Sequence, residues 1–281
     1  MAEDKIVAIA FSDLHIHKFK RFDKNNSRLS WTLKALETLL SKADALKVPI
    51  LFSGDLFHNP KEIENETLSL ALGAFNKCLK NNFLAISGNH DLSEKNNSDK
   101  RSPSHINSIA KTNNLFNNID FSWHAAKNFT VWGLPYMNYD LDLKKAIEKL
   151  KPEVKENPAK FKILLLHSDC PGAVTPEGLE LSETEHIPWD LDTFFKEWDL
   201  VLFGHIHKPQ KLSNRCYMMG SPIHQTAGDS GTDMGYWEIY ENKKIVFKRI
   251  SHKYPQFVKL ENGEYPPIEP GINYYIPHNA G

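Results

Sequence analysis

Short apolar runs along this chain end abruptly in clusters of polar residues. Each run is apolar on both faces, which is typical of a buried strand covered on both sides. The runs, each with the cluster that follows it, are 6–11 with 12–15, 50–52 with 53–55, 83–86 with 87–91, 163–166 with 167–169, and 200–203 with 204–207. Apolar residues at helical spacing separate some of them, at 31–46, 63–79 and 141–150. We predict a layered α/β fold with the polar clusters at one edge of its sheets.

The last third of the chain has a different pattern. Residues 217–219, 236–240 and 245–250 have strand character, and a short turn at 241–244 joins the last two. They predict an antiparallel sheet that extends the sandwich, after two further strands within 119–136. Beyond about residue 254 the chain is rich in Pro and Gly. We expect a catalytic domain at 1–252 and an extension at 253–281, either a remnant or the start of a capping region.

Composition and charge exclude several classes of protein. The chain has 281 residues, 34 Lys and Arg, 35 Asp and Glu, and a net charge of -1. A protein that coats nucleic acid through bulk charge would be strongly basic, so contact with phosphate must be local. Three cysteines without Cys-x-x-Cys favour neither a disulfide framework nor a thiolate zinc site. We find no signal peptide or membrane span, and expect a cytoplasmic protein, in the host cytoplasm if phage-encoded.

The polar clusters carry oxygen and imidazole donors of the kind that bind manganese, iron or zinc. Their number suits two ions, and a carboxylate is the best shared ligand because each oxygen can take one ion. In Asp-x-His and His-x-His, residues i and i+2 point to the same side of a strand. The candidate donors are Asp13, His15, Asp55, Asn89, His167, His205 and His207.

The order of these motifs resembles the calcineurin-like metallophosphoesterases. The matching set is Asp13-x-His15, Gly54-Asp55, Gly88-Asn89-His90-Asp91, His167 and Gly204-His205-x-His207, within residues 6–208. The resemblance implies a two-sheet α/β/β/α sandwich that holds two divalent ions, with manganese expected before magnesium, iron or zinc. It assigns one ion to Asp13, His15, Asp55 and His207, and the other to Asp55, Asn89, His167 and His205.

The same resemblance implies roles beside the metals. His90 would contact the phosphate and help the leaving oxygen depart. Asp91 would orient the His90 imidazole through its second nitrogen, or cap a helix, or both. Two cations lower the pKa of a bound water, which suits hydrolysis of a phosphoester.

Within the family, the stretch Gly54-Asp55-Leu56-Phe57-His58 is similar to the SbcD-type DNA repair nucleases and related phage recombination endonucleases. In that group the histidine at position 58 also approaches the scissile phosphate. The segments Met219-Gly220-Ser221-Pro222, Gly228-Asp229 and Met234-Gly235-Tyr236 agree, although Met234 replaces a frequent basic residue and His17 a frequent glycine. The resemblance implies exonuclease and endonuclease activity on DNA, a homodimer, and an SbcC-type ATPase partner.

Alternatives stay open at this level. Gly-Asn-His-Asp also occurs in small-molecule phosphodiesterases that act on cyclic nucleotides or nucleotide-sugar lipids. A scaffold without chemistry is disfavoured by the intact donor set. The basic run at 17–22 could contact a nucleic-acid backbone through Lys18, Lys20 and Arg21, or could be a solvated loop. We expect Phe129, Trp132 and Tyr136 in the core. We expect structural or solvent-exposed positions for the other histidines, with His124 and His224 as the first exceptions.

Overall fold

The computed structural model describes residues 4–19, 27–94, 102–137, 140–182, 187–250, 256–260 and 272–275. Its strands are β1 (Ile6–Phe11), β2 (Ile50–Phe52), β3 (Phe83–Ala85), β4 (Phe116–Asn118), β5 (Ser122–Ala125), β6 (Thr130–Leu134), β7 (Lys162–His167), β8 (Leu200–Gly204), β9 (Gln210–Lys211), β10 (Cys216–Met218), β11 (Gly235–Tyr240), β12 (Ile245–Arg249), β13 (Gln256–Lys259) and β14 (Ile272–Tyr275). Its helices are α1 (Ser27–Leu46), α2 (Asn65–Cys78), α3 (His105–Ala110), α4 (Asp140–Glu156), α5 (Leu191–Phe194) and the 3-10 turn η1 (Ala227–Asp229).

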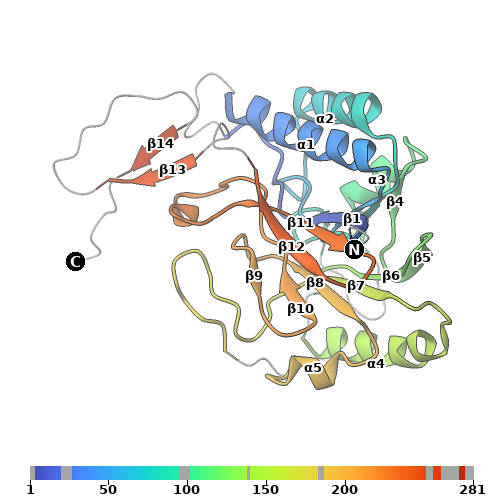
Figure 1. The fold of residues 1–281 in the computed structure, drawn as a ribbon. Coiled ribbons are helices and arrows are strands. Elements are labelled where there is room, and N and C mark those ends of the chain that lie inside the picture. The colour runs from blue at the N-terminus through green and yellow to red at the C-terminus, as the bar shows by residue number, and fades with distance from the viewer. Residues whose placement is uncertain are drawn as a thin grey trace.

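Two six-stranded sheets form the centre of the molecule. The first has the order β12-β11-β1-β2-β3-β4, and the second has the order β5-β6-β7-β8-β10-β9. Helices α1, α2 and α3 lie on one side of this pair, and α4 and α5 lie on the other (Figure 1). The predicted α/β/β/α sandwich is therefore confirmed.

Three apolar layers hold these elements together. Along β1, Ile9 and Phe11 pack with the helices of the first layer, whereas Ala8 and Ala10 pack with the second sheet. Side chains on the other face of the second sheet, such as Trp132, pack under α4 and α5. Strands that are apolar on both faces are thus buried because each sheet is covered on both sides.

The structure corrects two predicted elements. Helix α4 continues past Pro152, because Val154 in its last turn is fully buried and Glu153 accepts a 2.9 Å hydrogen bond from the indole of Trp132. Strand β10 does not join the antiparallel extension: it pairs in parallel with β8 in the second sheet. Only β11 and β12 form the antiparallel extension of the first sheet, with β11 antiparallel to β1 and β12 antiparallel to β11.

The strands β13 and β14 form a separate two-stranded sheet beside the sandwich (Figure 1). The N–H of Phe257 donates to Nδ1 of His224 at 2.9 Å, and the N–H of Lys259 donates to Oγ of Ser230 at 3.1 Å. A domain boundary near residue 252 stays a prediction. Within the described ranges, every helix is too short or too polar to cross a membrane.

Candidate metal centre

Strand ends from both sheets deliver the predicted donors to one edge of the sandwich. The loops after β1, β2 and β3 come from parallel neighbours in the first sheet, and those after β7 and β8 come from parallel neighbours in the second. The first two loops also pair with each other, since the N–H groups of Asp13 and His15 donate to the carbonyls of Gly54 and Asp55 at 2.9 and 3.0 Å. Strand order therefore brings the loops of each sheet together, and the packing of the two sheets brings the two sets of loops to one edge.

Several donors lie on strained backbone. Residues other than glycine rarely adopt φ values between 46° and 102°, which are found here at Asp13, His15, Asp55 and His205. Gly54 has a φ of 97°, and a Cβ at this position would lie 2.5 Å from Nδ1 of His167. A Cβ on Gly88 would lie 2.6 Å from the backbone nitrogen of Asp55. The motif glycines are thus required by close packing between the loops.

The first cluster joins Asp13, His15 and His207, whose donor atoms lie within 4.8 Å of one another. Nε2 of His15 is 3.2 Å from Nε2 of His207 and 3.9 Å from Oδ1 of Asp13. Asp13 is fully buried, and its Oδ2 accepts a hydrogen bond from the hydroxyl of Ser12. A buried carboxylate that faces two imidazole nitrogens is a suitable donor set for a divalent cation.

The second cluster joins Asp55, His167 and His205, also within 4.8 Å. Oδ1 of Asn89 lies 3.0 Å from Nε2 of His167 and 3.0 Å from Nδ1 of His205. Nδ1 of His167 donates to the carbonyl of Ser53 at 2.7 Å, so Nε2 is the nitrogen that faces the cluster. The seven predicted donors therefore meet in two adjacent groups.

Asp55 lies between the two groups. Its Oδ2 is 3.7 Å from Nε2 of His15 and 3.4 Å from Nε2 of His167. Its Oδ1 accepts the backbone N–H of His90 at 2.8 Å. One oxygen of Asp55 therefore faces both clusters, while the other accepts a backbone N–H; the sharing of this carboxylate between two ions stays a prediction.

The charges at the centre are unevenly distributed. Burial alone would lower the pKa of both His167 and His207, but the charge of Asp55 raises the pKa of His167 to about 9. Hydrogen bonding and charge from Asp229 raise the pKa of His207 to about 8. Burial lowers the pKa of His15 well below its usual value. Although burial opposes it, the neighbouring imidazoles, led by His167, keep the pKa of Asp55 low. These raised pKa values favour the protonated imidazoles of His167 and His207 at neutral pH in the metal-free protein, and a bound cation would have to displace those protons.

His90 and His58 lie beside the first cluster. Their rings are stacked, with centroids 5.1 Å apart and an interplanar angle of 18°. Nδ1 of His90 donates to the carbonyl of His58 at 2.5 Å, so Nε2 lies at the opposite edge of the ring. Donor atoms of His15, His58 and His90 lie within 4.8 Å of one another. The structure therefore brings both predicted phosphate-contacting histidines to the centre.

Asp91 has a different role from the predicted one. It is fully buried, and its two oxygens accept the N–H groups of residues 55–57 and of Gly88 at 2.7 to 3.3 Å. The carbonyl of His58, not this carboxylate, orients the ring of His90. Burial and the nearby Asp55 charge raise the pKa of Asp91 to about 8, against the N–H donors. Asp91 fastens the loop after β2 to the loop after β3, and it caps none of the described helices.

Asp229 was not predicted as a site residue. Its Oδ2 lies 3.3 Å from Nδ1 of His207 and also accepts the N–H groups of Gln225 and Thr226, at 2.7 and 2.8 Å. Because Nδ1 of His207 faces this fully buried carboxylate, Nε2 faces His15. The Gly228-Asp229 pair in the matched motif was the available sequence signal.

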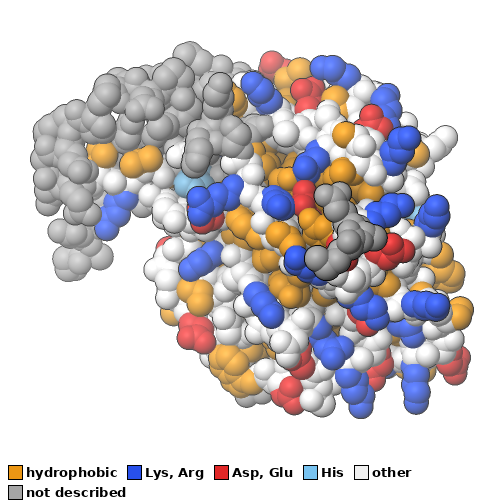
Figure 2. Space-filling view, viewed as in Figure 1, with side chains coloured by type: hydrophobic (Ala, Val, Ile, Leu, Met, Phe, Trp, Pro, Cys, Tyr) orange, Lys and Arg blue, Asp and Glu red, His pale blue; other side chains and the backbone are white. Residues whose placement is uncertain are grey.

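The predicted substrate-binding residues are placed only in part. Nζ of Lys18 lies 3.0 Å from Oε2 of Glu64 and also contacts Glu66, so two carboxylates engage its charge. Lys20 and Arg21 lie outside the described residues. On the face drawn in Figure 2, Lys and Arg are interleaved with Asp and Glu and form no continuous basic band among the described residues.

The aromatic residues divide between core and site. Phe129 and Trp132 are buried in the core as expected. Tyr136 differs: its ring lies 6.1 Å from that of His167 and 6.0 Å from that of His205. It follows β6, the strand next to β7, so its ring borders the second cluster.

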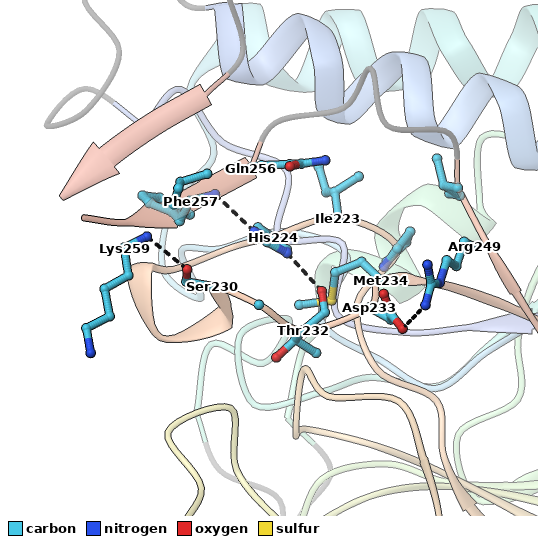
Figure 3. Close-up of a pocket in the computed structure, with 14 residues that line it drawn as sticks. Ile223, His224, Ser230, Thr232, Asp233, Met234, Arg249, Gln256, Phe257 and Lys259 are labelled. Atoms are coloured by element: carbon cyan, nitrogen blue, oxygen red, sulfur yellow. Dashed lines mark hydrogen bonds and ion pairs between the residues drawn. The ribbon is translucent and has the colours of Figure 1, made fainter. Parts of the chain in front are cut away.

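His224 and His124 lie away from the two clusters. His224 is buried, and its Nε2 donates to the carbonyl of Thr232 at 3.0 Å while Nδ1 accepts from Phe257 (Figure 3). It lines a cavity of about 390 Å³ between β13 and residues 230–234. His224 therefore ties β13 to the sandwich. His124 lies on the edge strand β5.

Comparisons with known proteins match most of this chain. The family model described as calcineurin-like phosphoesterase matches residues 7–209. A protein of Invertebrate iridescent virus 3, named "Putative phosphoesterase 078R", is 22% identical over 210 residues, which cover 74% of this chain and 56% of the viral protein. The chain therefore spans little more than half the length of this relative.

Two solved structures that match most of this chain have little sequence identity to it. The calcineurin-like phosphoesterase YfkN from Bacillus subtilis is 13% identical, with a TM-score of 0.47 over 88% of this chain and 91% of that one. The sulfate thiohydrolase SoxB of Thermus thermophilus is 11% identical, with a TM-score of 0.43 over 86% of this chain and 55% of that one.

Proposed function

Because this chain belongs to the calcineurin-like phosphoesterase family, we propose that it is a two-metal-dependent nuclease that acts on DNA in repair and recombination. Membership of the family makes it a metal-dependent phosphoester hydrolase, and DNA is the substrate that we propose. The observation that carries this proposal is the position of His58, whose ring lies 5.1 Å from that of His90 and 5.4 Å from that of His15. The matching histidine of SbcD-type nucleases approaches the scissile phosphate.

The donors would divide between two ions, which we propose to be manganese. Asp55 would be shared, with Asp13, His15 and His207 on one side and Asn89, His167 and His205 on the other. The bound ions would supply Lewis-acid stabilisation of the phosphate and a water of lowered pKa. The fit is supported by the 3.2 Å approach of the His15 and His207 nitrogens beside buried carboxylates.

His90 would act on the leaving oxygen. Since Nδ1–H of His90 already donates to the carbonyl of His58, only Nε2 can reach the substrate. Donation of a proton from Nε2 requires the doubly protonated imidazole. His58 would hold the phosphate from the neighbouring position in the stack.

Binding of the DNA duplex would require more than one chain. The net charge is -1, and Lys18 is engaged by Glu64 and Glu66. We therefore propose that a second copy of this chain and an SbcC-type ATPase hold the duplex, while the metal centre binds one phosphate. Free cysteines among the described residues are compatible with the cytoplasm as the proposed compartment.

A small-molecule phosphodiesterase is the second candidate, and one observation favours it. A cavity of about 320 Å³ beside His58 is lined by Glu62 and Glu64 as well as by Lys18. These carboxylates would repel a second phosphate, whereas a substrate with a single phosphodiester would avoid that repulsion. The two candidates differ in substrate and share the chemistry.

A substrate panel separates the candidates. Manganese-loaded protein is incubated with end-labelled single- and double-stranded DNA, cyclic nucleotides and bis-p-nitrophenyl phosphate, alone and with an SbcC-type ATPase. We expect release of nucleotides from DNA that Asp55→Ala or His90→Ala abolishes and the control His124→Ala retains. Hydrolysis of cyclic nucleotides without any cleavage of DNA would favour the second candidate.

A further inference from the structure

A column of stacked rings runs outward from His90. The ring of His58 lies between those of His90 and His17, at centroid distances of 5.1 and 4.2 Å and interplanar angles of 18° and 20°. The ring of Phe19 lies 3.9 Å from that of His17, tilted by 35°. The column therefore connects a predicted catalytic side chain to the loop after β1.

His17 and Phe19 are themselves held in place. Nδ1 of His17 donates to the carbonyl of His15 at 2.7 Å, which fixes the plane of its ring. The guanidinium of Arg28, in α1, lies 4.0 Å from the Phe19 ring centroid, a cation–π contact. Arg28 is buried and also donates to the carbonyl of His224. Phe19, at the outer end of the column, is therefore held against α1 by Arg28.

His58 depends on this column for its orientation. Its side chain is exposed, and among the described residues no hydrogen bond of its ring nitrogens is found. Ring contacts therefore restrict its rotation: His90 and His17 stack on its two faces, and His15 makes an edge-to-face contact. Its carbonyl in turn receives Nδ1–H of His90, so the backbone of His58 and both rings are coupled.

We propose that His17 is a positioning residue, which holds the imidazole of His58, and through it that of His90, against the phosphate at the metal centre. This inference rests on the proposed phosphoester hydrolysis. His17 lies outside the residues assigned to the metals or the phosphate, and its ring contacts those of His58 and Phe19. His17 would touch neither metal nor substrate.

The test compares His17→Ala with His17→Phe, which keeps a ring that can stack. Turnover of bis-p-nitrophenyl phosphate is measured with manganese-loaded protein, together with metal content and Tm. We expect His17→Ala to lower kcat about ten-fold with metal content unchanged, and His17→Phe to restore most of it. His124→Ala is the control. His17→Ala should add nothing in a His58→Ala background, because both act through the same side chain.

A second readout does not depend on turnover. In NMR spectra of the metal-free protein, His17→Ala should remove the ring-current shift that His17 gives the His58 ring protons and also reduce the shift that His90 gives them, because the His58 ring is no longer held in the stack. His17→Phe should restore both. Full kcat in His17→Ala, or an equal loss with and without His58, would overturn the positioning role. Wild-type protein that hydrolyses no phosphoester would instead overturn the proposed function, while the NMR result would still decide whether the stack orients His58.

Discussion

The Asp229 carboxylate lies 3.3 Å from Nδ1 of His207, and this contact turns Nε2 of His207 toward His15. Removal of a carboxylate behind a metal-binding imidazole typically costs 10- to 100-fold in metal affinity. We expect Asp229→Asn to weaken one of two manganese binding events by about that factor in calorimetric titrations. The control is Asp233→Asn, an exposed carboxylate that pairs with Arg249. Equal binding in Asp229→Asn and wild type would contradict the orienting role.

Asp91 should matter for folding as much as for activity. An amide at this position can accept through one oxygen only, so part of the N–H set from residues 55–57 and Gly88 would lose its partner. We expect Asp91→Asn to lower the free energy of unfolding by about 3 kcal/mol, with loss of activity. Urea denaturation measures the first effect. Wild-type stability combined with a loss confined to kcat would restore the predicted catalytic role for Asp91.

Gly54 and Gly73 give a matched pair of glycine substitutions. A Cβ at Gly54 would press on Nδ1 of His167 from a φ of 97°, whereas a Cβ at Gly73, in α2, meets nothing within 4 Å. We expect Gly54→Ala to abolish metal binding and activity. Gly73→Ala should raise the free energy of unfolding by about 0.5–1 kcal/mol and leave activity unchanged. Thermal melts and metal content distinguish these outcomes.

The stability of the metal-free protein should fall as pH rises above neutrality. Nearby carboxylates raise the pKa of His207 to about 8 and that of His167 to about 9, against about 6.5 when unfolded. A raised folded pKa stabilises the protein fully below pH 6.5, and this stabilisation is lost as pH rises through 8 to 9. Metal binding at pH 7 should correspondingly release protons. Melting curves from pH 6 to 9.5 test the first expectation, and titrations in buffers of different ionisation enthalpy test the second. A Tm that stays constant from pH 6 to 9.5 would contradict the expected loss of stability.

Local patterns were enough for the fold class and for the donor list. Runs that are apolar on both faces predicted covered strands, and strand ends in a layered α/β fold predicted where Asp13, Asp55 and His167 would meet. Apolar spacing predicts a helix only at 141–150, whereas α4 continues through Pro152 to Glu156, although a proline disfavours the interior of a helix. The burial of Val154 outweighs this local preference, and packing between distant segments is invisible to periodicity.

The sequence by itself determined which chemistry the strand ends can support, because donor type and motif order are properties of the chain. Tertiary structure decided how those groups are used. It places one oxygen of Asp55 between both clusters, turns Asp91 to the backbone, and brings Asp229 behind His207. It also stacks His17 on His58. These relationships depend on ångström-scale distances between loops of different strands, and only the packing of the two sheets sets those distances.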